Sequence, residues 1–339
     1  MTSAASSRVA DYQRRNMRNT NKQGRWPLLT GALALVMLVA ACGSDGNDDV
    51  AGSGSIGEKF DLGGATVTVG SKEFTEQLIL GNLTKLALTA AGAKVEDQIG
   101  LQGSTTVRAA LTSGEIDLYW EYLGTGWVTY LKNEKGIPGA QPQFEAVRDA
   151  DAANGVTWLD PAPFNDTYAI AASSETAERL GVASISDLAA LVASNPADAT
   201  FCVGGEFSTR PDGLPGLEKA YGFKVAPDNV SNVQDALVYN QVDKGECAFG
   251  SITSTDGRVG SLGLTVLTDD KQFFPPFNGS MNVRSEMLDE HPEIKDIFAP
   301  IAAALDDATM VGLNAKVDVD GEEPADVAKT WLTENGYIG

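Results

Sequence analysis

The sequence has few of the residues on which most enzymes depend. Its 339 residues include one histidine and three cysteines. The histidine, His291, precedes Pro292 at the start of an expected surface helix, so a serine or cysteine nucleophile would have a poorly placed base. Neither a Walker A sequence nor a GxGxxG motif after a strand occurs. We therefore predict a protein that is not an enzyme, with no catalytic residues, no cofactor and no metal site.

Basic residues are scarce as well. The chain has 25 Lys and Arg against 46 Asp and Glu, which gives a formal net charge of -21. No stripe of Lys and Arg follows the N-terminal region, and nucleic-acid binding requires such clusters to neutralise phosphates. The hydrophobic content of 43% is typical of a globular protein, and the length allows two lobes with sizeable cores.

The N-terminal region has the pattern of a bacterial targeting signal. Six basic residues precede an apolar run, LLTGALALVMLVAA, which is short for a membrane span but suits a signal peptide. Ala40 and Ala41 before Cys42 resemble a lipobox, in which the cysteine is lipidated. We predict a lipoprotein signal peptide over residues 1–42 and attachment to the extracytoplasmic face of a bacterial membrane. An uncleaved anchor or an ordinary signal peptide is the alternative.

The segment after Cys42 is rich in Gly, Ser and Asp, so we expect a flexible tether over residues 43–60. Two cysteines then remain, Cys202 and Cys247, in the short apolar runs TFCVGG and ECAFGS. In an oxidising compartment a disulfide between them is favoured, although two free buried thiols are also compatible with the sequence.

From residue 65 onward, strand-like and helix-like segments alternate. TVTVG, the helical run after Thr75, KVEDQI, STTVRAALTSG and EIDLYW form a βαβαβ series. A second series follows WLDPAPF, and Pro275 and Pro276 mark a crossing back. The pattern predicts an α/β protein of two lobes, 61–163 plus 275–339 and 164–274, each a mixed, mostly parallel sheet flanked by helices. Ligands of such folds bind beyond the carboxyl ends of the strands.

Six loops at these strand ends contain recognisable motifs. In chain order they are GSKEFTEQLILGNL, SGEIDLYWEYLGTGW, FNDTYAIA, EFSTRPDGLPGLEKAYG, STDGR and DDKQFFPPF. Together they resemble the substrate-binding proteins of quaternary-ammonium ABC importers, which bind glycine betaine, proline betaine, carnitine and choline as osmoprotectants. The resemblance implies a type II, Venus-flytrap periplasmic-binding fold, no turnover, and a permease with a cytoplasmic ATPase as partners. We expect the protein itself to be a monomer.

The resemblance assigns an aromatic cage to three residues. Tyr122 and Tyr168 correspond to cage tyrosines, and Phe277 corresponds to a further cage aromatic. A trimethylammonium group has no N–H to donate, so electron-rich ring faces hold it at about 0.5–2 kcal/mol per ring. Thr253 stands where relatives frequently have another aromatic residue. A compensating ring could come from elsewhere, with Trp120, Trp127 and Phe207 as the candidates.

The resemblance also assigns polar contacts. Lys72 and Arg210 match positions that can meet a ligand carboxylate, Gln77 and Thr125 match polar wall positions, and Asp166 would supply negative potential near the cation. Each assignment has an alternative. The two tyrosines would be core aromatics at strand ends, Phe277 would pack a hinge, and the two cationic residues would be surface ions or loop clamps. Thr253 also leaves open another ligand, such as ergothioneine, a polar amino acid or a different osmolyte, and the fold could instead serve an extracellular sensor.

Overall fold

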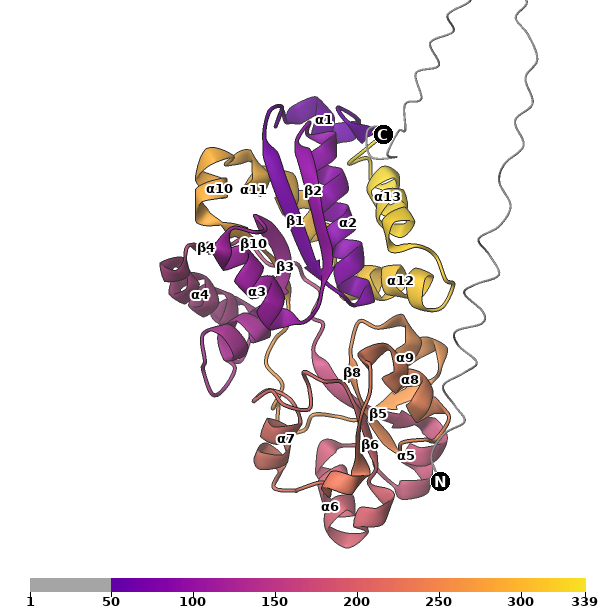
Figure 1. Ribbon diagram of the computed structural model, residues 1–339. Coiled ribbons are helices and arrows are strands. Elements are labelled where there is room, and N and C mark those ends of the chain that lie inside the picture. The colour runs from indigo at the N-terminus through magenta and orange to yellow at the C-terminus, as the bar shows by residue number, and fades with distance from the viewer. Residues whose placement is uncertain (1–49) are drawn as a thin grey trace, which may run out of the picture. The chain divides into compact units, whose positions relative to one another are not determined.

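The computed structural model describes residues 50–339, and the predicted signal peptide with Cys42 lies outside these residues. The described chain forms two lobes, each built around a five-stranded sheet (Figure 1). Within residues 50–339 no helix has the length and apolar character needed to cross a membrane.

The first lobe contains the sheet with strand order β2-β1-β3-β10-β4. Its strands are β1 (Thr66–Lys72), β2 (Lys94–Leu101), β3 (Leu118–Tyr122), β4 (Val156–Trp158) and β10 (Gly279–Arg284). β1 pairs in parallel with β2 and β3, whereas β10 is antiparallel to both β3 and β4. Four of the five strands therefore run in one direction.

The second lobe repeats this arrangement in the order β7-β6-β8-β5-β9. Its strands are β5 (Tyr168–Ser173), β6 (Phe201–Val203), β7 (Val230–Asn232), β8 (Phe249–Thr253) and β9 (Leu264–Val266). β6 is parallel to β7 and β8, and β5 is antiparallel to β8 and β9. The prediction of two mixed, mostly parallel sheets is confirmed, because in each lobe a single strand runs against the other four.

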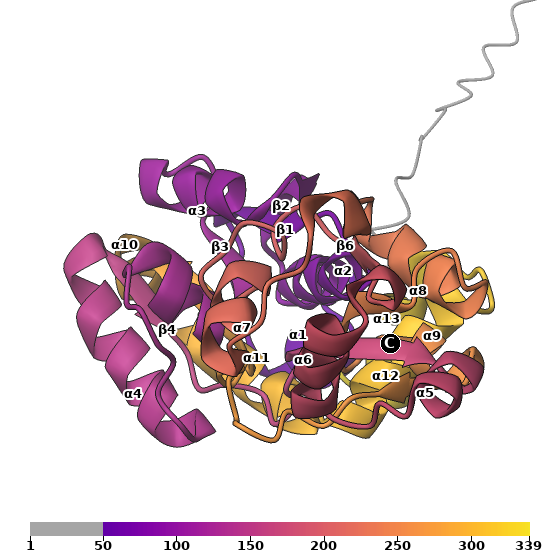
Figure 2. The ribbon, with the colours of Figure 1, turned by 90° about the horizontal axis from the view of Figure 1, so that it is seen from below.

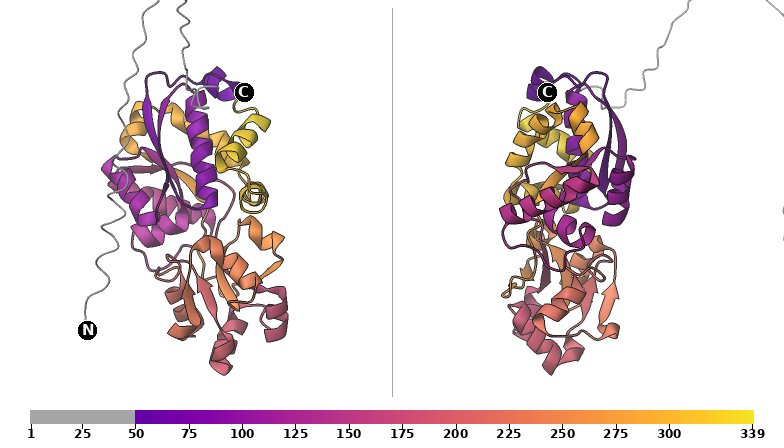
Figure 3. Two further views of the ribbon diagram at one scale, coloured as in Figure 1. Left: turned by 45° about the vertical axis from the view of Figure 1, so that its right-hand side comes forward. Right: turned by 90° about the vertical axis from the view of Figure 1, so that its left-hand side faces the viewer.

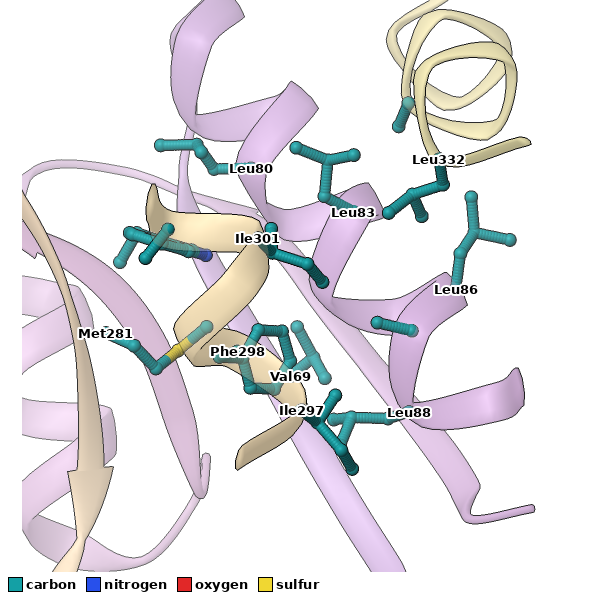
Figure 4. Close-up of a cluster of buried hydrophobic side chains, with 14 of the residues drawn as sticks. Val69, Leu80, Leu83, Leu86, Leu88, Met281, Ile297, Phe298, Ile301 and Leu332 are labelled. Atoms are coloured by element: carbon teal, nitrogen blue, oxygen red, sulfur yellow. The ribbon is translucent and has the colours of Figure 1, made fainter. Parts of the chain in front are cut away.

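Helices cover both faces of the first sheet. They are α1 (Gly54–Lys59), α2 (Thr75–Ala90), α3 (Ser104–Ser113), α4 (Ala140–Asp151), α10 (Ser285–Glu290), α11 (Glu293–Ala304), α12 (Asp307–Asp318) and α13 (Pro324–Glu334). A π-helical turn, Thr125–Tyr130, follows β3. The core lies between α2, α11, α13 and the sheet, where Val69, Leu83, Phe298 and Leu332 meet (Figure 4). Helix α2 is buried on most sides, and its buried residues include the polar Glu76, Gln77, Thr84 and Thr89 as well as the apolar ones.

The second lobe has five helices of its own. They are α5 (Ser174–Leu180), α6 (Ile185–Ser194), α7 (Leu214–Tyr221), α8 (Asp235–Asp243) and α9 (Gly257–Ser261). Figure 2, viewed from the end of this lobe, shows α6 nearest the viewer. Ser184 and Asp187 form a reciprocal capping box that begins α6. A disulfide joins Cys202 in β6 to Cys247, which shortly precedes the neighbouring strand β8.

Two segments cross between the lobes, one from β4 to β5 and one from β9 to β10 (Figure 3). They lie side by side, because Asn165 and Asn278 form an antiparallel bridge. The Phe277 N–H donates to Asn165 Oδ1 at 2.6 Å, and the Asp166 N–H donates to the Phe277 carbonyl at 3.2 Å. Asp166 and Phe277 therefore belong to the crossing segments.

The last part of the predicted tether is folded. Residues 54–59 form α1, and both Val50 and Ile56 are buried in the first-lobe core. The N–H groups of Ser55 and Ile56 also donate to carbonyls of Gly336 and Tyr337 near the C-terminus. The two apolar side chains provide the burial that the polar composition did not indicate, so the expectation of a tether as far as residue 60 is wrong for residues 50–60.

Candidate functional site

A cavity of about 220 Å³ lies between the two lobes, at the carboxyl ends of strands β1, β3 and β8. The first lobe contributes residues from the β1–α2 junction, the start of α3, the end of β3 and α12. The second lobe contributes residues from the loop before α7, from α8 and from the end of β8, and the crossing segments supply Asp166 and Phe277. This is the position that the sheet pattern predicts for a ligand.

Five aromatic rings line the cavity. They are Phe74, Tyr122, Tyr168, Tyr239 and Phe277. The rings of Tyr168 and Phe277 meet edge to face with centroids 5.4 Å apart, and those of Phe74 and Tyr122 stack at 6.2 Å. The three predicted cage residues are thus brought to one cavity although they come from β3, β5 and a crossing segment. Tyr239 and Phe74 were not among the predicted cage residues.

The glycine of the YLGTG motif has a specific packing role. A Cβ added to Gly124 would lie 2.8 Å from two carbons of the Phe277 ring. Real Cβ atoms are not found so close to a ring carbon, and a buried ring has little room to move. Gly124 therefore allows Phe277 to approach the end of β3.

Thr253 lines the cavity without a ring and pairs with Tyr168 across β8 and β5. The Thr253 N–H donates to the Tyr239 hydroxyl at 3.2 Å, so Tyr239 provides a ring next to this position. The three residues proposed from the sequence to replace the missing ring do not line the cavity. Trp120 lies in the first-lobe core, and Trp127 and Phe207 also pack behind the wall.

Lys72 lines the cavity but has an internal partner. Its Nζ lies 2.6 Å from Glu121 Oε1, and both side chains are buried. Glu121 also accepts hydrogen bonds from the hydroxyls of Tyr119 and Tyr130. The Lys72 Nζ stands 4.8 Å from the centre of the Tyr122 ring, within the range of a cation–π contact. A ligand carboxylate at Lys72 would therefore compete with Glu121 for the positive charge of the lysine.

Arg210 is likewise paired within the protein. Its Nε and Nη2 donate to the two oxygens of Asp212 at 2.8 and 2.6 Å, and its Nη1 donates to Glu206 at 3.0 Å. Nη2 also donates across the cleft to Thr125 Oγ1 at 3.2 Å. The guanidinium carbon is 5.6 Å from the centre of the Tyr168 ring. Thr125 therefore lines the cavity and also connects the lobes.

Gln77 is the one predicted polar wall residue that does not line the cavity. It is completely buried, and its Oε1 accepts the backbone N–H of Lys72 at 3.3 Å. Helix α2 turns residue 77 away from the cavity while residues 74–76 and 78 face it. The prediction of Gln77 as a wall residue is wrong; Gln77 instead supports the strand end from which Lys72 projects.

Glu76 is a cavity residue that the sequence reasoning missed. Its Oε1 accepts the Tyr122 hydroxyl at 2.8 Å, and its Oε2 accepts the Asn314 amide at 3.0 Å and the Thr255 hydroxyl at 2.5 Å. The Thr255 hydroxyl also lies 2.6 Å from Asp166 Oδ1. Burial, followed by the charge of Asp166, raises the pKa of Glu76 to about 8. Burial also raises the pKa of Asp166, to about 6.

The cavity wall has more acidic than basic groups. Seven carboxyl groups and three cationic side chains line it, a surplus of four negative charges when all are ionised. The cationic side chains are Lys72, Arg210 and Arg258. Each forms an ion pair with at least one carboxylate, at 2.5 to 2.6 Å for its shortest pair. The cavity therefore favours a cation, and especially one that presents methyl groups to aromatic rings.

The lobes contact each other across the cleft through side chains. Glu206 accepts the backbone N–H of Ser104 at 2.7 Å and its hydroxyl at 3.0 Å, at the start of helix α3. Burial alone would raise the pKa of Glu206, but the charges of Lys72 and Arg210 lower it below its ordinary value. An ionised Glu206 is favourable at a helix N-terminus.

Comparison with known proteins agrees with this geometry. The profile of a family described as the substrate binding domain of ABC-type glycine betaine transport systems matches residues 65–334. The chain is 39% identical over 278 residues to the glycine-betaine-binding protein of Pseudomonas aeruginosa, a match that covers 80% of this chain and 89% of that protein. It is 33% identical over 275 residues to the ergothioneine transport permease/ergothioneine binding protein EgtU of Helicobacter pylori, covering 80% of this chain and 48% of that one.

A solved structure extends the comparison to the fold. Apo YehZ from Escherichia coli is similar with a TM-score of 0.59 and 33% identity, over 80% of this chain and 99% of that one. The predicted type II periplasmic-binding fold is thereby confirmed. Substrate-binding proteins of ABC importers work outside the cytoplasm and bind solutes without converting them, so the prediction that this protein is not an enzyme holds. The chain belongs to the family of substrate-binding domains of ABC-type glycine betaine transport systems.

Proposed function

We propose that this protein captures glycine betaine, or a related quaternary-ammonium compound, between its two lobes and delivers it to an ABC importer. The observation that carries the proposal is the combination of five aromatic rings with a surplus of carboxyl groups in one interlobe cavity. Family membership and the glycine-betaine-binding relative support the same ligand class.

The ligand would contact both lobes at once. Tyr122 from the first lobe, Tyr168 from the second and Phe277 from a crossing segment are the proposed cage, with Tyr239 beside Thr253 and Phe74 as further rings. Each ring face contributes about 0.5–2 kcal/mol to a bound trimethylammonium group. Because the rings belong to different lobes, binding energy is coupled to closure of the cleft.

A ligand carboxylate would be held by polar groups of the same cavity. Lys72, Arg210 and Thr125 remain the proposed contacts, and Thr125 already accepts a hydrogen bond from Arg210. Because both cations have internal carboxylate partners, we expect these polar contacts to contribute less affinity than the cage.

Ergothioneine is the second candidate ligand. It also has a trimethylammonium group, and the relative EgtU is named for its transport. Thr253 favours this candidate, because a threonine in place of a ring leaves more room beside Tyr168 and Tyr239.

The setting of the protein is part of the same proposal. From the sequence we propose a signal peptide over residues 1–42, lipid attachment at Cys42 and a monomeric state. The proposed lobes are residues 61–163 plus 275–339 and residues 164–274. Partnership with a permease and a cytoplasmic ATPase follows from the family. A gene for a signalling module fused to this domain would favour the sensor alternative.

Isothermal titration calorimetry tests the ligand. The protein is unfolded and refolded to remove bound solute, then titrated with glycine betaine, proline betaine, carnitine, choline, ergothioneine and several amino acids. Binding of at least one methylated ammonium compound, with no binding of leucine or glutamate, is the expected result. Binding of an amino acid and of no methylated compound would contradict the proposal.

A further inference from the structure

Three polar side chains from different parts of the fold converge at the cavity. Glu76 is in the first turn of α2, Asp166 is in a crossing segment, and Thr255 follows β8 in the second lobe. Thr255 Oγ1 lies 2.5 Å from Glu76 Oε2 and 2.6 Å from Asp166 Oδ1. All three side chains are buried, with exposed fractions of 3%, 6% and 1% for Glu76, Asp166 and Thr255.

The number of protons limits this arrangement. A threonine hydroxyl has one proton and donates one hydrogen bond, so it cannot donate to both carboxylates. At the second contact the carboxyl group must donate to the hydroxyl oxygen. The two short distances are therefore satisfied when the pair of carboxyl groups holds one proton. Such a proton belongs to the pair as a unit, because the two groups titrate together.

The surroundings favour this shared proton. Burial favours the neutral form of both carboxyl groups, and the charge of Asp256 in the second lobe acts in the same direction on Asp166. The hydrogen bonds that Tyr122 from β3 and Asn314 from α12 donate to Glu76 oppose this effect, and Asp318 of α12 also lines the cavity. Each of the three cations that line the cavity pairs with another carboxylate: Lys72 with Glu121, Arg210 with Asp212 and Arg258 with Asp256. No unpaired cation among the cavity-lining residues thus balances the second negative charge of the pair.

We propose that Glu76 and Asp166 form a charge-selecting pair for the ligand, which loses its shared proton when a permanent cation enters the cavity. The inference rests on the proposed function, because it requires a quaternary-ammonium ligand. A nearby positive charge favours the ionised form of both carboxyl groups, and an uncharged ligand of the same shape does not. The pair therefore distinguishes a charged head group from an uncharged one of the same shape. The rings discriminate less, because they also contact the apolar methyl groups.

The coupling has a definite sign. Binding that releases a proton is opposed by acid, so affinity for a permanent cation rises as the pH rises. For one proton fully released, affinity changes by up to about tenfold per pH unit below the pKa of the pair. Glycine betaine and choline have no group that titrates near neutral pH, so any dependence in this range comes from the protein.

The test is calorimetry of the full chain with glycine betaine and choline at about pH 6 and about pH 8, in two buffers with different heats of ionisation. The difference between buffers gives the number of protons released. We expect about tenfold weaker binding at the lower pH and release of a fraction of a proton. The uncharged choline analogue 3,3-dimethyl-1-butanol should bind weakly, with no proton release.

Two variants identify the groups. Glu76→Gln and Asp166→Asn should each remove the proton release and flatten the pH dependence, and each should narrow the gap between choline and its uncharged analogue. Glu145→Gln, at an exposed position of α4, should behave as the unmodified protein. Thermal unfolding of each variant shows whether it is folded. One folded carboxyl variant is sufficient for the test, because the shared proton requires both groups.

The outcomes separate this inference from the proposed function. Binding with equal affinity at both pH values and no proton release would overturn the charge-selecting pair and leave the proposed function intact. Proton release that persists in either folded carboxyl variant would also overturn it, because another group would be its source. If no quaternary-ammonium compound binds at either pH, the proposed function fails and the coupling fails with it.

Discussion

Glu206 of the second lobe accepts two hydrogen bonds from Ser104 of the first, one from the backbone N–H and one from the hydroxyl. The same carboxylate accepts from Arg210 at 3.0 Å. One side chain therefore connects the start of helix α3, the opposite lobe and a proposed ligand contact. Such a contact exists only when the lobes meet, so its free energy is added to that of ligand binding.

Glu206→Gln should weaken this connection. The amide keeps the shape but loses the negative charge at the helix N-terminus, a loss of about 0.5–2 kcal/mol. We expect affinity for glycine betaine to fall about two- to thirtyfold, measured by calorimetry. Glu246→Gln, at an exposed position of the same lobe, is the control and should bind as the unmodified protein. Equal affinity for both variants would show that the contact contributes nothing to closure.

Tyr168→Ala removes a central ring of the proposed cage. Its ring meets those of Phe207 and Phe277 at 5.1 and 5.4 Å. We expect at least about tenfold weaker binding of glycine betaine, because a ring face is lost and its aromatic neighbours lose contacts. Tyr168→Phe keeps the ring face and should retain most of the affinity. Unchanged calorimetric affinity of Tyr168→Ala would remove this residue from the site.

Gly124→Ala should disturb the cavity wall without any change of charge. The new methyl group would lie 2.8 Å from the Phe277 ring, so the ring or the end of β3 must move. We expect a loss of about 1–3 kcal/mol in the free energy of unfolding and weaker ligand binding. Gly312→Ala, in α12 with open space around its Cα, should be neutral or stabilising. Urea unfolding of both variants makes the comparison.

The carboxyl pair should make stability depend on pH. Burial raises the pKa of Glu76 from 4.5 to about 8, so between these values the folded state binds more protons than the unfolded state. The resulting stabilisation is present below pH 4.5 and is lost as the pH rises through about 8. Without added ligand, the free energy of unfolding should therefore decline over this pH range by at least about 1 kcal/mol more in the unmodified protein than in Glu76→Gln, as measured by thermal unfolding. A parallel decline in both proteins would contradict this assignment.

The disulfide should stabilise the second lobe. Cys202 and Cys247 are 45 residues apart in sequence, so the bond restricts a long loop of the unfolded chain. We expect the double replacement by serine to lower the free energy of unfolding by about 2–4 kcal/mol. Intact mass after alkylation, with and without prior reduction, measures the bond directly. Alkylation of both cysteines without reduction would contradict it.

Much of the local structure follows from sequence pattern. The alternation of strands and helices indicates two α/β lobes because burial of one face imposes periods of two and 3.6 residues on apolar side chains. Tyr119 and Trp120 are neighbours on β3 and pack into different core clusters, because successive side chains of a strand point to opposite faces of the sheet. Motifs at the strand ends also indicate three of the rings, since loops that close around a ligand require particular glycines and aromatic residues.

Other features depend on contacts between distant segments. The ion pair of Lys72 with Glu121 spans 49 residues, and the contacts of Thr255 with Asp166 and Glu76 span 89 and 179. Tyr239 lies beside Thr253 only because α8 packs on β8. Periodicity records which face of an element is buried but not which partner it meets. Sequence pattern was sufficient for most of the elements, the family and three of the five rings, whereas the pairing of the buried charges became clear only in the folded chain, because it depends on ångström-scale distances between segments far apart in the sequence.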